Sequence, residues 1–548
     1  MSALAAVVAA TLAEHGLRQA FGVVGGGNIM TVAGLTGAGV RYVAARHEGG
    51  AVAMADAYHR ATGEVAVCTT SHGPGVTNIA TGLAEAVKHR SGLLVVCGDA
   101  PTDRMRRIDV DQTGLARSLG AEVVRIGSVG AARADTARAL RIARDQHCPV
   151  VLCLPGDLLT AEVPDTAPTA LDRQETGRSA QPAELVGLDA ALRALAGARR
   201  PLLLAGLGAW RSGAAKPIAD LADRVGGLLS TTAMATGMFG ATEWSLGICG
   251  GFSSPPAAAL IGQADVVVVF GASLDLFTLH GGRLISPQAT VVQVDTAEAA
   301  TAERVDLLVT GDASAAASAL LDGVDDLGAA PSTWRAQVGD LSRIGWPHHG
   351  FEDRGGAERI DPRTLTLALA DLLPAERTLV LDGGHFISWP MMYWPVADPS
   401  ALVFIGSAFQ VIGLGFAGAV GAACGRADRT TVVALGDGGA LMGISELETL
   451  VRTAPSAVVV VYDDAAYGFE AHLYGPKGAD LSTAVFDDTD FAGVARSLGA
   501  RAATVRSTAD LSALRDWLDD GAVGTLVLDC KVEAAVVAGF LADMTSGH

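Results

Sequence analysis

The chain has 548 residues, half of them hydrophobic, and a net charge of −19. At roughly 150 residues per domain, this length predicts about three domains, and the acidic excess argues against nucleic acid or an anionic membrane as a partner. The seven cysteines include no CxxC pair, so the sequence indicates neither a zinc site nor a disulfide framework.

The N-terminal stretch MSALAAVVAATLAEHG has no basic start and carries Glu14. These features predict an amphipathic helix and not a signal peptide. No uninterrupted apolar stretch reaches the roughly 18 residues that a transmembrane helix needs. We therefore expect a soluble, cytoplasmic protein.

Residues 1–165 are predicted to form the first domain. Three buried-strand runs, Val65–Thr69, Leu93–Cys97 and Val150–Leu154, are each followed by a loop marked by glycine or proline. This alternation of strands and helices is typical of an α/β domain with a doubly wound parallel sheet. The following segment, Ala161–Pro182, is rich in Pro, Thr, Asp and Ala and predicts a linker.

Two stretches of this first domain carry chemistry. Arg46–Tyr58, RHEGGAVAMADAY, starts a predicted helix with Glu48 in its first turn, where an acid also complements the helix dipole. Ser71–Asn78, SHGPGVTN, is a loop that contains His72.

Residues 185–325 are predicted to form a second α/β domain. Its predicted strands are Pro201–Ala205, Val266–Phe270, Val291–Val294 and Leu307–Val309. Gly206-Leu207-Gly208 follows the first of these strands but continues as Ala-Trp-Arg, so the dinucleotide-binding fingerprint is incomplete. A second Gly- and Asp-rich linker is predicted at about Asp326–Asp361.

Residues 362–548 are predicted to form a third domain, which begins with a strand at Thr378–Leu381. Gly413–Gly418 satisfies the pattern GxGxxG. We interpret it mainly as the small-residue start of a closely packed helix, with a dinucleotide role as the weaker alternative.

The most informative stretch of the third domain is Thr431–Phe469. It starts with a buried strand that ends in Gly436-Asp437-Gly438-Gly439. A helix follows, in which Ser445 stands three residues before Glu448, the spacing of a capping box. This helix ends at Pro455, and a second buried strand, Ala457–Tyr462, stops at Asp463-Asp464. A strand–helix–strand unit makes the strands parallel, so both acidic ends should emerge at the same carboxyl edge of the sheet.

Asp437 and Asp464 offer hard oxygen ligands at that edge. The main-chain amides of Gly438 and Gly439 are open to an anion. Carboxylates beside free amides suit Mg²⁺ or Ca²⁺ bound together with a phosphate. No Walker A sequence occurs, so a P-loop is not the source of the phosphate site. The alternative is a glycine-rich turn and a surface acidic turn without a ligand.

The GDG motif, the acidic strand end about 25 residues later and the following Tyr467-Gly468 resemble the thiamine diphosphate (ThDP) fingerprint. The segments GISELETLVR and AAYG look like those of the acetohydroxyacid (acetolactate) synthase, benzoylformate decarboxylase and pyruvate oxidase superfamily. The resemblance implies Mg²⁺ ligands at Asp437, Asp464 and the main-chain carbonyl of Ala466. It implies cofactor contacts at Gly384, His385, Gln410, Ile412, Gly436, Asp437, Gly438, Gly439, Asp464, Ala466, Tyr467 and Gly468. The family usually has Asn where this chain has Asp464.

The resemblance also assigns roles to single residues. Glu48 stands where the family places the glutamate that hydrogen-bonds the pyrimidine ring and activates the cofactor. Ile412 takes the place of the residue that props the cofactor into its bent form, and the carbonyl of Gln410 would accept from the pyrimidine amine. His385 is a candidate phosphate contact. His72 is a candidate acid or base, and Gln112 is a candidate contact to the substrate.

The family's three-domain order implies a pyrimidine-binding domain at 1–165, a central domain at 185–325 and a diphosphate-binding domain at 362–548. It also implies a homodimer or homotetramer in which Glu48 of one subunit serves the cofactor held by another. Gly271–Leu276 departs from the Asp-Asp-Arg-like segment of flavin-binding synthases, which leaves FAD in doubt. Phe469–His472 departs from the synthases' Met-Val-Arg-Gln, so Glu470 and His472 are candidates for an altered specificity.

The predicted reaction is decarboxylation of a 2-oxo acid and carboligation of the resulting enamine to a second carbonyl, such as an aldehyde or another 2-oxo acid. The loop Gly73-Pro74-Gly75, which is like that of the synthases, favours carboligation. The alternatives are a non-ligating 2-oxo acid decarboxylase and a 2-hydroxyacyl lyase. From other classes, a flavin-dependent oxidase of the pyruvate-oxidase type and a non-catalytic paralogue stay open.

Overall fold

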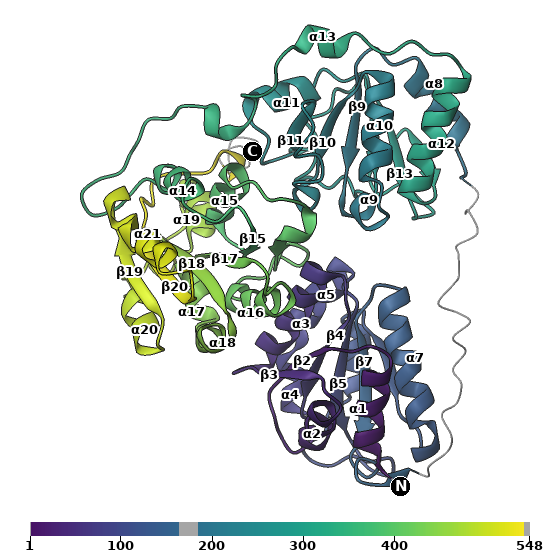
Figure 1. The fold of residues 1–548 in the computed structure, drawn as a ribbon, viewed down its shortest axis with the longest axis vertical. Coiled ribbons are helices and arrows are strands. Elements are labelled where there is room, and N and C mark those ends of the chain that lie inside the picture. The colour runs from purple at the N-terminus through teal and green to yellow at the C-terminus, as the bar shows by residue number, and fades with distance from the viewer. Residues whose placement is uncertain (1, 164–184, 542–548) are drawn as a thin grey trace.

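The computed structural model describes residues 2–163 and 185–541. In this part of the chain, three six-stranded sheets follow one another, each with helices against it (Figure 1). All strand pairs within these three sheets are parallel, as predicted for consecutive doubly wound α/β domains. Most of the predicted linker Ala161–Pro182 lies outside the described residues.

The first sheet contains two of the predicted strands nearly unchanged and a third shifted by one residue. Shorter strands that the sequence pattern missed occupy its edges and one inner position. The strand order is β3 (Arg41–Ala44), β2 (Gln19–Gly22), β4 (Ala66–Thr70), β5 (Leu93–Asp99), β7 (Val150–Pro155) and β6 (Glu122–Arg125). The predicted N-terminal helix is present as α1 (Leu4–Glu14), which buries Leu4, Val8 and Leu12 on one face.

The second sheet contains all four strands predicted for residues 185–325. Its order is β11 (Ser245–Ile248), β10 (Leu228–Thr231), β9 (Pro201–Ala205), β12 (Val266–Phe270), β13 (Thr290–Asp295) and β14 (Leu307–Thr310). The predicted linker 326–361 is not a free connection. It contains the helix α13 (Trp334–Val338), and the side chain of Trp334 is packed into a core of this second unit.

The third sheet has the order β16 (Leu402–Phe404), β15 (Arg377–Leu381), β17 (Thr430–Gly436), β18 (Ser456–Asp463), β20 (Gly524–Lys531) and β19 (Arg501–Val505). β17 and β18 are neighbours, and Gly436 pairs with Tyr462. The two acidic strand ends therefore emerge side by side at one edge, as the strand–helix–strand pattern predicted.

The first and third domains share a core. α3 (Glu48–Thr62) and α16 (Gly415–Gly425) lie against each other, and one apolar cluster includes Met54 from α3 and Val420 from α16. A Cβ at Gly421 would lie 2.1 Å from the carbonyl oxygen of Met54. Only glycine allows this approach of the two backbones, which agrees with the interpretation of Gly413–Gly418 as the start of a closely packed helix.

The predicted capping box at Ser445 is wrong. Ser445 is the first residue of α18 (Ser445–Thr453), the cap position is Ile444, and no side chain caps this helix. The Glu448 carboxylate instead accepts two hydrogen bonds of 2.7 Å from the Arg46 guanidinium of the first domain. A paired guanidinium is a stronger partner for a carboxylate than a single main-chain amide.

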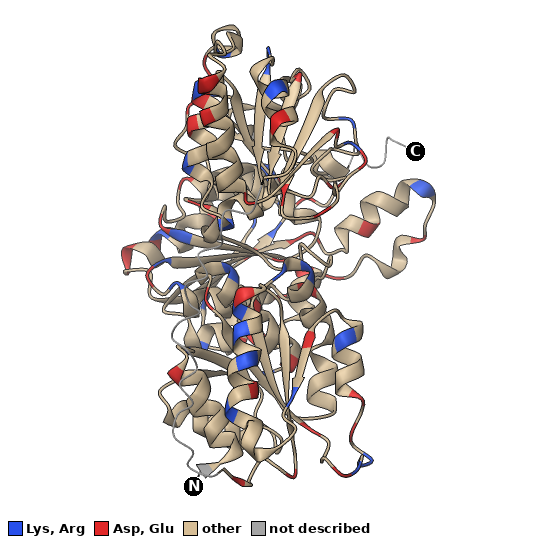
Figure 2. Cartoon of the chain, turned by 90° about the vertical axis from the view of Figure 1, so that its right-hand side faces the viewer, with Lys and Arg blue, Asp and Glu red and all other residues tan. Residues whose placement is uncertain are grey.

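Charged residues lie mainly on helices and loops, while the strands are largely uncharged (Figure 2). Within residues 2–163 and 185–541, no helix is both long enough and apolar enough to cross a membrane.

Candidate active site

A buried carboxylate, Asp437, and a partly buried one, Asp464, lie next to each other at the carboxyl edge of the third sheet. Asp437 begins α17 (Asp437–Met442), and Asp464 follows the end of β18. Burial, together with the charges of Asp464 and Asp463, raises the pKa of Asp437 to about 8. Burial and the charge of Asp463 raise the pKa of Asp464 to about 6. Because like charges this close repel, the pair is poised to receive a cation or to keep a proton.

One oxygen of this pair has no partner. Asp437 is 2% exposed, and its Oδ2 atom is buried without a hydrogen bond. No group of three or more His, Cys, Asp or Glu side chains that could hold a metal occurs in the described ranges. A cation here would therefore need main-chain carbonyls, water or a bound phosphate as further ligands. That mixed oxygen set is what Mg²⁺ commonly takes, so the residues fit this ion.

The glycines after Asp437 leave no room for side chains. A Cβ at Gly438 would lie 2.6 Å from a ring carbon of Tyr467, and a Cβ at Gly439 would lie 2.9 Å from Asp382 Oδ2. Both positions therefore require glycine, because the neighbouring Tyr467 and Asp382 side chains leave no space for a Cβ. Gly436 and Gly468 flank the pair, and a Cβ at Gly468 would lie 2.5 Å from Asp464 Oδ2.

Asp382 connects this site to the loop that carries Gln410 and Ile412. It follows β15, is fully buried, and accepts hydrogen bonds from the amides of Gly383 at 2.8 Å and Gly413 at 2.9 Å. Burial raises its pKa to about 6, although the main-chain amides act in the opposite direction. No role was predicted for Asp382 from the sequence. The signal was an acid at the end of a buried strand, the same signal that singled out Asp437.

The loop itself presents its residues outward. Gln410 has a φ of 58°, in the left-handed region, and is exposed. Ile412 is 37% exposed. An exposed aliphatic side chain such as Ile412 offers apolar surface that a ligand or another chain can cover.

His385 is placed differently from a simple phosphate contact. Its ring is 7% exposed, and Nε2 accepts a hydrogen bond of 3.0 Å from the amide of Ala538. Burial and the neighbouring His472 lower the pKa of His385 to about 3. The ring is therefore neutral, and only Nδ1 is left for a ligand. Gly384, directly before it, has a φ of 140°, a conformation that glycine supplies.

The first domain contributes a second set of residues at its own carboxyl edge. Glu48 is the first residue of α3, and its Oε2 atom accepts a hydrogen bond of 2.9 Å from Asn78 Nδ2. Gln112 is buried. Its Oε1 atom accepts from the Gly73 amide at 2.7 Å, and its Nε2 atom donates to the Gly98 carbonyl at 2.9 Å. Gln112 thereby holds the loop of His72, and a contact from Gln112 to a substrate would have to replace one of these bonds.

No hydrogen bond or ion pair joins Glu48, His72 or Gln112 to the set around Asp437 in the part of the chain that the structure describes. The structure thus brings together the residues within each set but not the two sets. Two carboxylates accept hydrogen bonds from main-chain amides of the other domain, and the sequence pattern did not predict these contacts. Glu446 of the third domain holds the backbone before Glu48. Glu85 of the first domain holds the backbone before Gln410.

Three protein-family models together match most of the chain. Residues 2–152, 188–320 and 382–529 match, in this order, the N-terminal TPP binding domain, the central domain and the C-terminal TPP binding domain of thiamine pyrophosphate enzymes.

Among curated proteins, the chain is 26% identical to "Probable acetolactate synthase large subunit" of Methanocaldococcus jannaschii, over 92% of this chain and 87% of that protein. It is 25% identical to a sulfoacetaldehyde acetyltransferase of Alcaligenes xylosoxydans xylosoxydans, over 93% of this chain and 89% of that protein. Among solved structures, a thiamine diphosphate-dependent 4-hydroxybenzoylformate decarboxylase of Rhodococcus jostii RHA1 matches with a TM-score of 0.81 and 20% identity, over 97% and 99% of the two chains. This last likeness shows the fold alone.

Proposed function

The chain belongs to the thiamine pyrophosphate enzyme family, and on this premise we propose that it uses ThDP and Mg²⁺ to decarboxylate a 2-oxo acid and to join the product to a second carbonyl compound. The carboxylate pair Asp437–Asp464, in which a buried Asp437 oxygen without a partner precedes two glycines, is the observation that carries the proposal. The relatives are named as a synthase and an acetyltransferase, which favours ligation over simple decarboxylation.

The third domain would hold the cofactor's charged end. The carboxylates of Asp437 and Asp464 and the carbonyl of Ala466 would bind Mg²⁺, and the amides of Gly438 and Gly439 would bind the diphosphate. The ion would relieve the repulsion that raises both carboxyl pKa values. When bound, ThDP would supply a nucleophilic thiazolium carbon for the substrate carbonyl and a cationic ring as the sink for the electron pair left when CO₂ departs.

The first domain would supply the acid–base group. Glu48 would hydrogen-bond a ring nitrogen of the aminopyrimidine and share its proton, which favours the tautomer that acts as a base. The carbonyl of Gln410 would accept from the pyrimidine amine, and Ile412 would support the bent cofactor.

A second copy of the chain would complete each site. Large apolar side chains are exposed at both carboxyl edges. In the first domain these are Ile29 and Met30, at 51% each, and Met105, at 60%. In the third domain they are Leu441, at 43%, and Met442, at 54%. Each edge carries only part of the residues assigned above, and an uncovered apolar surface favours association. We infer a homo-oligomer in which the first domain of one subunit covers the third domain of another. Light scattering should give a dimer or tetramer.

The direct test is the cofactor. Purified protein, denatured and examined by mass spectrometry, should release ThDP, and the bound ThDP should exchange its thiazolium C2 proton with solvent. Glu48→Gln should stop this exchange while binding stays largely intact, and the exposed Glu122→Gln should leave both unchanged. Normal exchange in Glu48→Gln would remove Glu48 from the mechanism.

Products decide between ligation and its alternatives. With pyruvate and with an aromatic 2-oxo acid, a ligase gives CO₂ and a hydroxyketone or hydroxy acid, whereas a decarboxylase gives CO₂ and a free aldehyde. Aldehyde as the sole organic product would replace ligation with the decarboxylase assignment. Co-purified flavin with peroxide formation would point to an oxidase, and ThDP binding without CO₂ release from any 2-oxo acid would point to a non-catalytic paralogue.

A further inference from the structure

A large cavity lies where the three domains meet, and none of the residues assigned to the two sets above is among its lining residues. Its volume is about 790 Å³. It is lined by the C-terminal part of α3, by α9 (Leu207–Arg211) of the second domain, and by residues 399–402 and 425–426 of the third domain. Glu48 stands at the opposite end of the 15-residue α3, so roughly 20 Å of helix separates the cavity from the proposed catalytic group.

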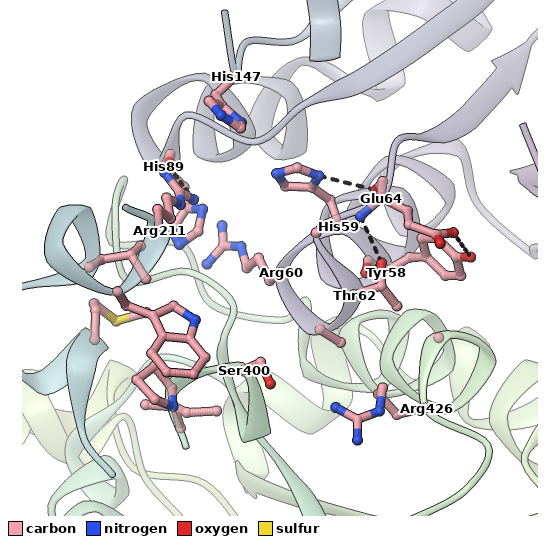
Figure 3. Close-up of a pocket in the computed structure, with 18 residues that line it drawn as sticks. Tyr58, His59, Arg60, Thr62, Glu64, His89, His147, Arg211, Ser400 and Arg426 are labelled. Carbon is pink, nitrogen blue, oxygen red and sulfur yellow. Dashed lines mark hydrogen bonds between the residues drawn. The ribbon is translucent and has the colours of Figure 1, made fainter. Parts of the chain in front are cut away.

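The wall of this cavity is cationic, although the chain as a whole is strongly acidic. Three arginines line it, Arg60, Arg211 and Arg426, and the one carboxylate among the lining residues is Glu64. Figure 3 shows His89, Arg211 and Arg60 close together on one side and Arg426 across the cavity from them.

Two of the three arginines already have partners. Arg60 is buried, forms ion pairs of 2.6 Å with Asp56 and 2.9 Å with Glu85, and donates to the carbonyl of Phe404 at 2.6 Å. Arg426 forms an ion pair of 3.2 Å with Asp428.

Arg211 has no such partner. Its one hydrogen bond is a long contact of 3.5 Å from Nη2 to the carbonyl of His89, and no ion pair to it occurs within residues 2–163 and 185–541. Desolvation by the surrounding protein and the neighbouring charge of Arg60 lower the pKa of Arg211 to about 10, although the charge of Asp56 acts in the opposite direction. A guanidinium remains charged at neutral pH under these conditions. Arg211 is exposed, so the cavity presents a charged guanidinium that forms no ion pair in the described ranges.

Histidines add neutral donors around this cation. Burial and nearby arginines lower the pKa of both His89 and His147, so the two rings are uncharged at neutral pH. His59 Nδ1 lies 3.1 Å from the carbonyl oxygen of Glu64, which occupies one ring nitrogen. The indole of Trp210 adds an apolar wall. A charged fork with neutral N–H donors and an aromatic wall suits an anion with an organic skeleton.

We propose that this cavity binds a small organic anion with at least two negative charges, a phosphate ester or a dicarboxylate, with Arg211 as its anchor. Such a ligand contacts all three domains at once. It stabilises the folded protein by an amount that grows with the logarithm of the ligand concentration above the dissociation constant, and α3 connects the cavity to Glu48. The binding site does not depend on which reaction the enzyme catalyses.

Isothermal titration calorimetry tests this binding. The protein is first saturated with ThDP and Mg²⁺, so that phosphate cannot enter the proposed diphosphate site, and is then titrated separately with glycerol 3-phosphate and with succinate in low-chloride buffer. Saturable binding of one identifies the source of the anion, and binding of both establishes the charge class. If neither glycerol 3-phosphate nor succinate binds, the proposal is overturned.

Matched variants locate the binding. Arg211→Gln should weaken it at least tenfold, Arg211→Lys should retain part of it, and the exposed Arg193→Gln on α8 (Leu188–Ala196) of the same domain should leave it within twofold. Folding should survive Arg211→Gln, because the side chain makes no ion pair in the described ranges and only one long hydrogen bond. Equal binding in Arg211→Gln would overturn the proposal. If the protein takes up no ThDP, the proposed function fails, and the dependence of anion binding on Arg211 is still measured.

Discussion

The carboxylate of Glu446 accepts hydrogen bonds from two successive main-chain amides, those of Arg46 at 3.0 Å and His47 at 2.9 Å. Its other oxygen accepts a bond of 2.7 Å from Thr449 Oγ1. Glu446 belongs to the third domain and is 2% exposed, while the two amides immediately precede Glu48 in the first domain. A buried side chain of one domain thus fixes the start of the helix that carries the proposed acid–base group of the other.

Removing this acceptor should destabilise the protein and misplace Glu48. In Glu446→Ala, two partly buried amides lose their partner, which costs roughly 1–3 kcal/mol of unfolding free energy. Glu446→Gln keeps an acceptor oxygen and should cost less than about 1 kcal/mol. Urea denaturation measures the stabilities, and exchange of the cofactor's C2 proton should slow in Glu446→Ala alone. An alanine variant with unchanged stability and exchange would show that the two amides find other partners.

Glu85 should be more sensitive to substitution than an ordinary surface glutamate. It is fully buried, pairs with Arg60 at 2.9 Å and accepts from the amides of Gly406 at 3.1 Å and Phe409 at 2.6 Å. Glu85→Gln leaves a buried guanidinium with one carboxylate fewer and should lower the unfolding free energy by about 3 kcal/mol. Glu122→Gln, on the exposed edge strand, is the control. ThDP affinity should fall with Glu85→Gln, because the loop that it holds leads to Gln410 and Ile412. Loss of stability with unchanged affinity would separate the two roles.

Asp437→Asn should separate stability from cofactor binding. The raised pKa of about 8 for Asp437 means that the folded state binds this proton more tightly than the unfolded state. The associated stability is complete below the unfolded pKa of about 4 and is lost as the pH rises through 8. Without cofactor, at pH 8.5 in EDTA, Asp437→Asn should therefore be more stable than the parent protein by at least about 1 kcal/mol. It should also lose Mg²⁺-dependent ThDP binding. Retained binding would remove Asp437 from the metal site.

Asp464→Asn should keep Mg²⁺ and ThDP binding, because it restores the residue that the family usually has. It also removes one of the charges that raise the pKa of Asp437. The expected result is an affinity equal to or above that of the parent protein, measured by titration calorimetry. Complete loss of binding would mean that position 464 has been misassigned.

His59 should make the protein sensitive to acid. Burial lowers its pKa from 6.5 to about 4, so the neutral ring stabilises the folded state above pH 6.5, and this stability is lost as the pH falls towards 4. Between pH 7 and pH 4.5, His59 accounts for about 2 kcal/mol of lost unfolding free energy. His59→Gln should reduce the difference in stability between these pH values by that amount. His348→Gln, at an exposed position, should not, and an unchanged difference in His59→Gln would contradict the burial argument.

The sequence by itself determined the class of fold and the residue types at the sheet edges. Strands such as Pro201–Ala205 and Val266–Phe270 were identified to the residue, because a run of apolar and β-branched side chains between turn residues is a local signal. The same locality explains Asp437 and Asp464, since an acid that directly follows a buried strand must emerge at the carboxyl edge. Short strands such as Arg41–Ala44 were not predicted, because four residues are too few to show a distinctive hydrophobic pattern.

The tertiary structure alone decided which residues hold those acids and loops in place. Glu446 and His47 are 399 positions apart, and Glu85 and Phe409 are 324 apart, so no local pattern connects them. It also showed that Glu448 pairs with Arg46 and does not cap its own helix. The side-chain amide of Gln112 accepts a hydrogen bond from Gly73 and so holds the loop that contains His72. The cavity around Arg211 exists only because three domains meet there. Partners of buried polar groups are chosen by packing between distant segments, and this is the information that a sequence pattern does not carry.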